Sequence, residues 1–147
     1  MWDELVESAR NESGLWAESL RPDGERERVA VFSPLAPDRF ALGVETIYEA
    51  YLVHFGRSRL FDPPDQGERI LLGDYLYAHG LVRIANEGGV DAVAAMAELI
   101  SQCAALRSAG ESGDGDAWVV AARALGGDPG DEAIAAALER HSDRVAL

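Results

Sequence analysis

The sequence predicts an all-α protein, an antiparallel bundle of about six helices, and three observations support this fold class. Apolar residues recur at intervals of three and four along most of the 147-residue chain. Glycine, proline and aspartate gather in short segments between the periodic stretches, where they are typical of turns. No segment shows the sustained alternation of a half-buried strand. Because the connections are short, we expect neighbouring helices to run antiparallel within a single domain, residues 1–147.

Most of the helices have end signals in the sequence. Asp38 is a candidate N-cap for the second helix, and the glycine pair at 88–89 is expected to stop the third, because glycine readily adopts the left-handed conformation. Gly14 is able to interrupt the first helix. Residues 29–32 form either a short extended segment or the last turn of a further helix, and residues 110–116 are expected to be a flexible link. The helices are expected at about residues 2–20, 38–55, 65–87, 90–108, 117–125 and 131–144.

The chain is strongly acidic and contains no lysine. It has 26 Asp and Glu against 13 basic residues, all arginine, and a formal net charge of −13. Without lysine there is no Schiff-base chemistry and no Walker-type phosphate loop. We expect no nucleic-acid partner, because phosphate binding requires a basic surface. The acidic N-terminus does not read as a signal peptide, and no apolar run reaches the roughly 20 residues of a membrane span. We therefore expect a cytoplasmic protein.

Residues typical of catalysis or metal binding are few and scattered. His54, His79 and His141 form no motif with metal-ligand spacing, and His79 is expected to be a half-buried packing residue. The single cysteine, Cys103, lies among apolar residues, so we expect a buried and unreactive thiol. An enzymatic function would require a cleft in which His54 or His79 meets a carboxylate such as Glu45 or Asp74.

Two pairs of carboxylates are candidate sites. Glu45 and Glu49 lie one helical turn apart, where like charges repel, and this favours a solvent-facing pair over a catalytic dyad. Asp114 and Asp116 resemble the start of a calcium loop, but apolar helix follows from Trp118, and this favours a solvated linker. The sequence therefore predicts no catalytic residue, no metal and no cofactor.

Arg57 and Arg59 flank a serine and are open to two interpretations. Two guanidinium groups in this spacing match the oxygens of a diphosphate and could clamp it directly. Such a local basic pair is unusual in so acidic a chain, but we favour the alternative interpretation, surface salt bridges with Asp62 or Asp65.

Three segments in the middle of the chain share a pattern with a known family. The run from Ile70 to Gly80 (ILLGDYLYAHG) contains a Gly-Asp pair near the start of a helix, and a second helix continues beyond residues 86–89 to Gln102. Upstream, Leu52-Val-His54 ends the helix that begins near Glu45. Together these segments resemble the trans-polyprenyl diphosphate synthases, in which the Leu-hydrophobic-His sequence is followed by the DDxxD motif. In this chain Phe55-Gly-Arg-Ser-Arg59 follows instead, so all three carboxylate positions are lost.

The resemblance implies a partial isoprenoid-synthase-like core, with the helices of Glu45 and Asp74 packed as neighbours around a shared cavity. In that family the carboxylates hold the Mg²⁺ ions that bind the allylic diphosphate, so their loss implies a non-catalytic chain. The family includes short non-catalytic small subunits that pair with a catalytic large subunit. The resemblance therefore implies a partner subunit or homodimeric binding module in isoprenoid chain elongation. As partner it implies a second copy, in a homo-oligomer, or a full-length prenyl diphosphate synthase, in a hetero-oligomer.

The alternative function is a helical ligand-binding or regulatory protein unrelated to isoprenoids. Tyrosines in the two central helices are candidates for a docking face or for the lining of an apolar groove, with ordinary half-buried packing as the other interpretation: Tyr48, Tyr51, Tyr75 and Tyr77. The candidate ligand-binding residues are Arg57, Arg59, Tyr48, Tyr51, Asp74 and Tyr75.

Overall fold

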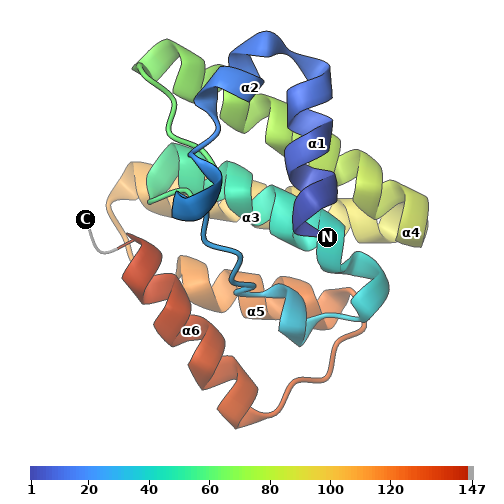
Figure 1. Ribbon diagram of the computed structural model, residues 1–147. Coiled ribbons are helices and arrows are strands. Elements are labelled where there is room, and N and C mark those ends of the chain that lie inside the picture. The colour runs from blue at the N-terminus through green and yellow to red at the C-terminus, as the bar shows by residue number, and fades with distance from the viewer. Residues whose placement is uncertain (146–147) are drawn as a thin grey trace.

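Helix α3, Ala41–Phe55, runs through the middle of an all-α structure (Figure 1). The computed structural model describes residues 1–145, in which six α-helices pack together without a strand, so the predicted fold class is confirmed. Every residue of α3 from Gly43 to Val53 is buried, as expected for a helix that is apolar on nearly all sides. The other helices are α1 (Trp2–Glu12), α2 (Gly14–Ser19), α4 (Gln66–Ala109), α5 (Asp114–Ala124) and α6 (Asp131–Val145).

Helix α4 is a hairpin of two helical halves that both pack along α3. Its backbone leaves the helical conformation at Gly89, with φ 70° and ψ −156°, a combination that favours glycine. The first half runs antiparallel to α3, and contacts between Gly80 and Ile47 and between Ile84 and Gly43 mark this direction. The second half runs back along α3 (Figure 1). Arg107, near its end, donates a hydrogen bond to the hydroxyl of Tyr51. The two helices predicted on either side of Gly88-Gly89 are thus confirmed.

The interface between α3 and the first half of α4 is filled. A Cβ atom added at Gly80 would lie 2.5 Å from Cγ1 of Ile47, and one at Gly43 would lie 2.6 Å from Cδ1 of Ile84. Glycine therefore permits this close approach of the two helices. The family resemblance predicted that these helices are neighbours around a shared cavity. They are neighbours, but they are packed against each other along this contact.

The helix start predicted at Asp38 is wrong by one turn, whereas the start predicted at Asp65 is confirmed. Asp38 does not cap α3; it begins a 3₁₀ turn, Asp38–Phe40, and Phe40 precedes the helix. Asp65 is the N-cap of α4 and accepts a hydrogen bond from the backbone N–H of Glu68 at 2.9 Å. The first predicted helix is divided at Ser13, whose backbone is extended. Residues 29–32 are not helical, so the helical alternative is wrong, and they lead into a 3₁₀ turn, Ser33–Leu35.

Two apolar clusters form the core on either side of α3. One contains Tyr48 and Tyr51 of α3 together with the second half of α4 and residues from α5 and α6, and the other joins α1 and α2 to the first half of α4. Cys103 lies in the first cluster, where burial raises the pKa of its thiol to about 11. This confirms the expected buried thiol.

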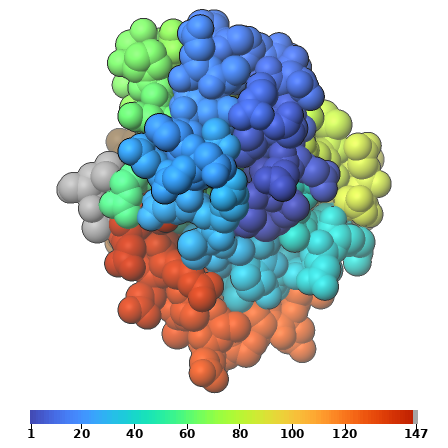
Figure 2. Space-filling model, in the orientation of Figure 1, coloured from blue at the N-terminus to red at the C-terminus, as the bar shows by residue number. Residues whose placement is uncertain are grey.

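Figure 2 shows the N-terminal residues, in blue, lying above α6, in red, on one face of the molecule.

Candidate functional site

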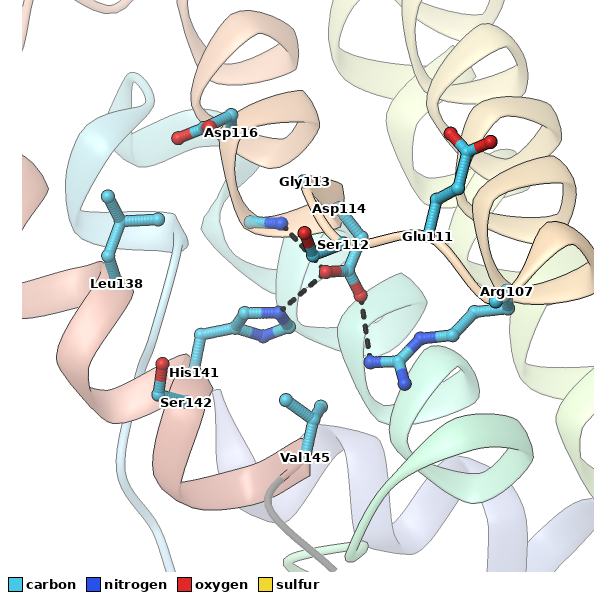
Figure 3. A pocket seen from close by; sticks show the side chains of 12 residues that line it. Arg107, Glu111, Ser112, Gly113, Asp114, Asp116, Leu138, His141, Ser142 and Val145 are labelled. Atoms are coloured by element: carbon cyan, nitrogen blue, oxygen red, sulfur yellow. Dashed lines mark hydrogen bonds and ion pairs between the residues drawn. The ribbon is translucent and has the colours of Figure 1, made fainter.

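A cavity of about 510 Å³ lies where the end of α4, the start of α5 and the end of α6 meet (Figure 3). Three polar side chains, one from each helix, point toward one another at its wall: Arg107, Asp114 and His141. We call these three residues and the two tyrosines behind them, Tyr48 and Tyr51, the open cluster. Cavities with a few convergent polar groups are the usual form of ligand sites in proteins.

Glycines in the short connection bring the first two of these residues together. Gly110 ends α4 with φ 69°, and Gly113 precedes α5 with φ 111°, both in the left-handed region. The chain therefore reverses within a few residues, and the last turn of α4 faces the first turn of α5. Arginine at a helix C-terminus and aspartate at a helix N-terminus also complement the helix dipoles. The predicted flexible link is thus wrong at its end, because α5 begins at Asp114.

Asp114 accepts hydrogen bonds from several donors and is buried, so the prediction of a solvated linker is wrong for this residue. Its Oδ2 accepts from Nη2 of Arg107 at 2.9 Å and from the hydroxyl of Tyr51. Its Oδ1 accepts from the backbone N–H of Gly115 at 3.1 Å and lies 3.6 Å from Nε2 of His141. Burial alone raises the pKa of Asp114, but His141 and the backbone amides outweigh it and lower the pKa below its ordinary value.

His141 connects this carboxylate to the core of the protein. The hydroxyl oxygen of Tyr48 lies 2.8 Å from its Nδ1. Burial raises the pKa of Tyr48 far above its ordinary value, so the phenol keeps its proton and donates it to Nδ1. A neutral His141 then carries its own proton on Nε2, on the side of Asp114. The open cluster is therefore a continuous polar chain from the core to the cavity.

The chemistry that this arrangement supports is binding by hydrogen bonds. Arg107 uses Nε and Nη2 for Tyr51 and Asp114, and within residues 1–145 its Nη1 has no protein acceptor. Nε2 of His141 also lacks a partner within hydrogen-bond distance. A ligand group that accepts hydrogen bonds would satisfy donors of this kind. Tyr48 is fully buried and its ionisation is disfavoured, so it does not act as a nucleophile in this state.

Of the six predicted ligand-binding residues, only Tyr48 and Tyr51 belong to the open cluster. Both are fully buried, so neither forms part of an exposed docking face. Tyr75 lies elsewhere, half-buried between Trp16 and His79, and His79 is half-buried as expected. Arg57 is exposed. The six residues therefore do not form one site.

Arg59 lies in a second, fully buried polar cluster, which we call the closed cluster: Arg59, Glu45, Glu49 and Ser58. Its Nη1 donates to Glu45 at 2.5 Å and its Nε to Glu49 at 2.8 Å. The expected surface salt bridges of Arg59 with Asp62 or Asp65 are therefore wrong. The expected solvent-facing position of Glu45 and Glu49 is also wrong, because the guanidinium between them compensates their repulsion.

The closed cluster anchors two loops to α3. Glu45 accepts from the backbone N–H of Val31 and of Ser33, at 3.2 and 2.9 Å. Glu49 accepts from the backbone N–H of Leu60, at 3.3 Å, and from the hydroxyl of Ser58. Burial alone lowers the pKa of Arg59, but the two carboxylates raise it above its ordinary value, so the guanidinium stays charged.

His54 and Asp74 do meet, as an enzymatic function would require, with Nε2 and Oδ1 3.5 Å apart. The imidazole packs directly on Gly73 and stacks on Tyr77, whereas the carboxylate is largely exposed. Neither residue lines any of the three cavities described for residues 1–145. This pair therefore joins the two segments of the family resemblance without forming a cleft of its own.

Sequence reasoning missed Arg107 and the roles of Asp114 and His141. The available signal was the glycine pattern at 110–115, which places the ends of two helices together. Nothing in the sequence indicates that His141 returns to this place. No known protein family, no curated protein and no solved structure matches this chain.

Proposed function

We propose that this chain is a non-catalytic helical partner module of a prenyl diphosphate synthase and that it docks through the exposed face of α4. The observation that carries the proposal is the exposure of apolar residues on this helix. An 18-residue stretch of α4 has a mean hydropathy of 1.3, yet only 22% of it is buried within the protein. Exposed apolar surface of this kind is characteristic of interaction sites.

The exposed face of α4 is mostly uncharged in its second half, where Asp91 and Glu98 are the exposed charged residues between Val90 and Ser108. Val90 is 84% exposed, and in the first half Leu71 and Val82 are 56% and 55% exposed. Between Val90 and the end of the helix the exposed positions are mostly small: Ala94, Ala97, Ser101, Ala104, Ala105 and Ser108. Small side chains allow the backbone of a partner helix to approach closely, so this surface suits helix-to-helix docking.

By length and composition α4 is also the one helix in residues 1–145 that could cross a membrane. The break at Gly89 divides it into two halves, and both pack along α3. Each half has one side on the core and one side exposed, which suits a protein partner that covers the exposed side.

The segment that resembles the synthases supports a non-catalytic role. His54 of the Leu-Val-His sequence packs on Gly73 of the Gly-Asp pair, so both parts of the resemblance lie in one place. The positions that would carry the metal-binding carboxylates include Arg59, whose charge is fully used by Glu45 and Glu49. Residues 55–59 therefore offer no carboxylate for Mg²⁺, and Arg59 has no free charge for a diphosphate.

The proposal is tested by co-purifying the chain with a full-length prenyl diphosphate synthase encoded in the same genome. We expect a stable complex, which Val90→Glu and Ala97→Glu disrupt because each places a charge in the docking face. The matched control is Val120→Glu, since Val120 is 62% exposed on α5. Formation of the complex by all three variants would contradict docking through α4, and association with a second copy alone would replace the synthase as the partner.

The non-catalytic part has its own test. We expect no product when the isolated chain is incubated with allylic and homoallylic diphosphates and Mg²⁺. Clear turnover by the isolated chain, in a preparation shown to be free of contaminating synthase, would contradict the non-catalytic role.

A second function, ligand binding, is favoured by the cavity at the open cluster. In this case a hydrogen-bond-accepting ligand would contact Nη1 of Arg107. Thermal-shift screening of small acceptor molecules, with Arg107→Gln as the comparison variant, is expected to find ligands that stabilise only the wild-type chain. Ligands that stabilise both equally would place binding elsewhere.

A further inference from the structure

A second cavity, of about 340 Å³, lies between α1, the start of α3 and the first half of α4. The residues that matter for its chemistry come from three segments: Ser8 from α1, Arg39 from the turn before α3, and His79 and Arg83 from α4. It contains no residue of the open or the closed cluster, and it does not depend on the proposed docking function.

Both arginines of this cavity lack the partner that arginine usually has. The chain carries two carboxylates for every arginine, yet within residues 1–145 neither Arg39 nor Arg83 forms an ion pair. The guanidinium of Arg39 stacks on the ring of Phe40, with its Cζ 4.5 Å from the ring centre. Stacking leaves the edge of a guanidinium, with its N–H groups, available for an acceptor.

Arg83 and His79 also contain polar atoms without a partner. Nη2 of Arg83 donates to Oγ of Ser8 at 2.7 Å, but Nη1 is enclosed and has no acceptor. Nε2 of His79, one helical turn earlier, is likewise enclosed and unpaired. Buried polar atoms without a hydrogen bond are unfavourable and uncommon in folded proteins. Three nitrogen-bearing side chains with unused hydrogen-bonding capacity therefore lie around one small cavity.

The remaining walls restrict the kind of ligand. Leu42 and Val82 contribute apolar surface, and Glu4 and Glu87 contribute negative charge. The two acids balance the two arginines, so the cavity has no large net charge to attract highly charged ions. A small ligand with one anionic group and one apolar part would use both kinds of surface. The planar fork of a guanidinium matches the oxygens of a carboxylate or a phosphate.

We infer that this cavity binds a small organic oxyanion, whose carboxylate or phosphate group is held by Arg39 and Arg83 and whose apolar part lies on Leu42 and Val82. His79 contacts the same anionic group from α4. Nη1 of Arg83 and Nε2 of His79 are enclosed in the wall of the cavity. On binding, the ends of these two side chains turn toward the oxyanion.

The test is calorimetric titration of the full chain with benzoate and with phenyl phosphate, alongside acetate and inorganic phosphate. We expect saturable binding of at least one aromatic probe, and the preferred probe identifies the oxyanion. The small ions are expected to bind more weakly because they do not reach the apolar wall. Each of Arg39→Gln and Arg83→Gln should weaken binding about tenfold, since each removes a charged hydrogen-bond donor.

Two control variants sharpen the result. Arg123→Gln removes an exposed arginine on α5 that forms no ion pair within residues 1–145, and it should leave the affinity unchanged. Glu87→Gln removes a negative charge beside the oxyanion and should tighten binding. Arg39 is exposed, so its variant is expected to fold normally even if Arg83→Gln does not.

A second readout locates the ligand. The chain has three histidines, and NMR spectra of their imidazoles distinguish His79 from His141 at the other cavity. The probe should shift the resonances of His79 and leave those of His141 in place. The proposal is overturned if the wild-type chain shows no saturable binding, if Arg123→Gln weakens binding as much as Arg39→Gln, or if only His141 responds.

Discussion

The closed cluster and the open cluster both place an arginine, a carboxylate and α3 together, but they differ in what surrounds them. Around Arg59 each carboxylate accepts hydrogen bonds from the guanidinium and from loop amides, and all members are buried. Around Arg107 the side chains face a cavity, and the nearest acceptor to Nε2 of His141, Oδ1 of Asp114, lies 3.6 Å away, beyond hydrogen-bond distance. The first arrangement fixes loops to a helix, and the second leaves hydrogen-bonding capacity for another molecule.

This difference separates a fully enclosed charge cluster from one that borders a cavity in the same protein. A buried ion pair adds little to stability compared with an apolar core, but removing one partner is costly, because the other charge stays buried. A cluster that borders a cavity loses less when it is changed, since water can replace the missing group. The two clusters should therefore respond differently to equivalent substitutions.

The largest expected effect is that of Arg59→Met. Two buried carboxylates would lose the one cation that pairs with them within residues 1–145, and we expect the free energy of unfolding to fall by about 3–5 kcal/mol. Arg107→Met should cost less, about 1–2 kcal/mol, because its side chain is partly exposed to water. Urea unfolding followed by circular dichroism measures both. The triple variant Glu45→Gln, Glu49→Gln, Arg59→Met should recover part of the loss, since it buries no charge. Equal losses for the two single variants would remove the distinction between the clusters.

An intermediate effect is expected from Tyr48→Phe, which removes the hydroxyl next to Nδ1 of His141. The ring still fills its place in the core, so the change isolates one buried hydrogen bond and should cost about 1–2 kcal/mol. Because Tyr48 links α3 to α6, amide hydrogen exchange should increase most in α6. Unchanged exchange in α6, measured by NMR or mass spectrometry, would show that this bond does not hold the helix.

The smallest expected effect concerns pH. Burial lowers the pKa of His54 and of His79, with Asp74 partly opposing it at His54. As pH falls, the two histidines are therefore protonated in the unfolded chain before they are protonated in the folded one. Their contribution to stability is fully present above about pH 6.5 and is lost as pH falls through their lowered pKa values in the folded protein. Asp114 also has a lowered pKa, but its contribution is lost only below about pH 4. Unfolding titrations from pH 7.5 to 5 should show a shallow loss that His54→Gln and His79→Gln each reduce. If both variants lose stability with pH as the wild-type chain does, titratable groups other than His54 and His79 cause the loss.

The sequence was sufficient for the helices but only partly for the sites. Apolar periodicity and the glycines at 88–89 predicted the central hairpin, because both signals are local. The burial of Glu45 and Glu49 was not predictable in this way, since it depends on Arg59, which follows after a loop. The open cluster depends on contacts over still longer distances, for example between Tyr48 and His141, 93 residues apart. Local patterns carry no information about such pairs, and only the packing of α6 against α3 and α5 brings them together.

The most direct test of the account is sedimentation velocity of the chain mixed with the full-length prenyl diphosphate synthase encoded in the same genome. We predict a faster-sedimenting complex that contains both chains. The Val120→Glu variant should still form this complex, and the Val90→Glu variant should not. A mixture in which the two wild-type proteins sediment separately, each as it does alone, would contradict the proposed partner function.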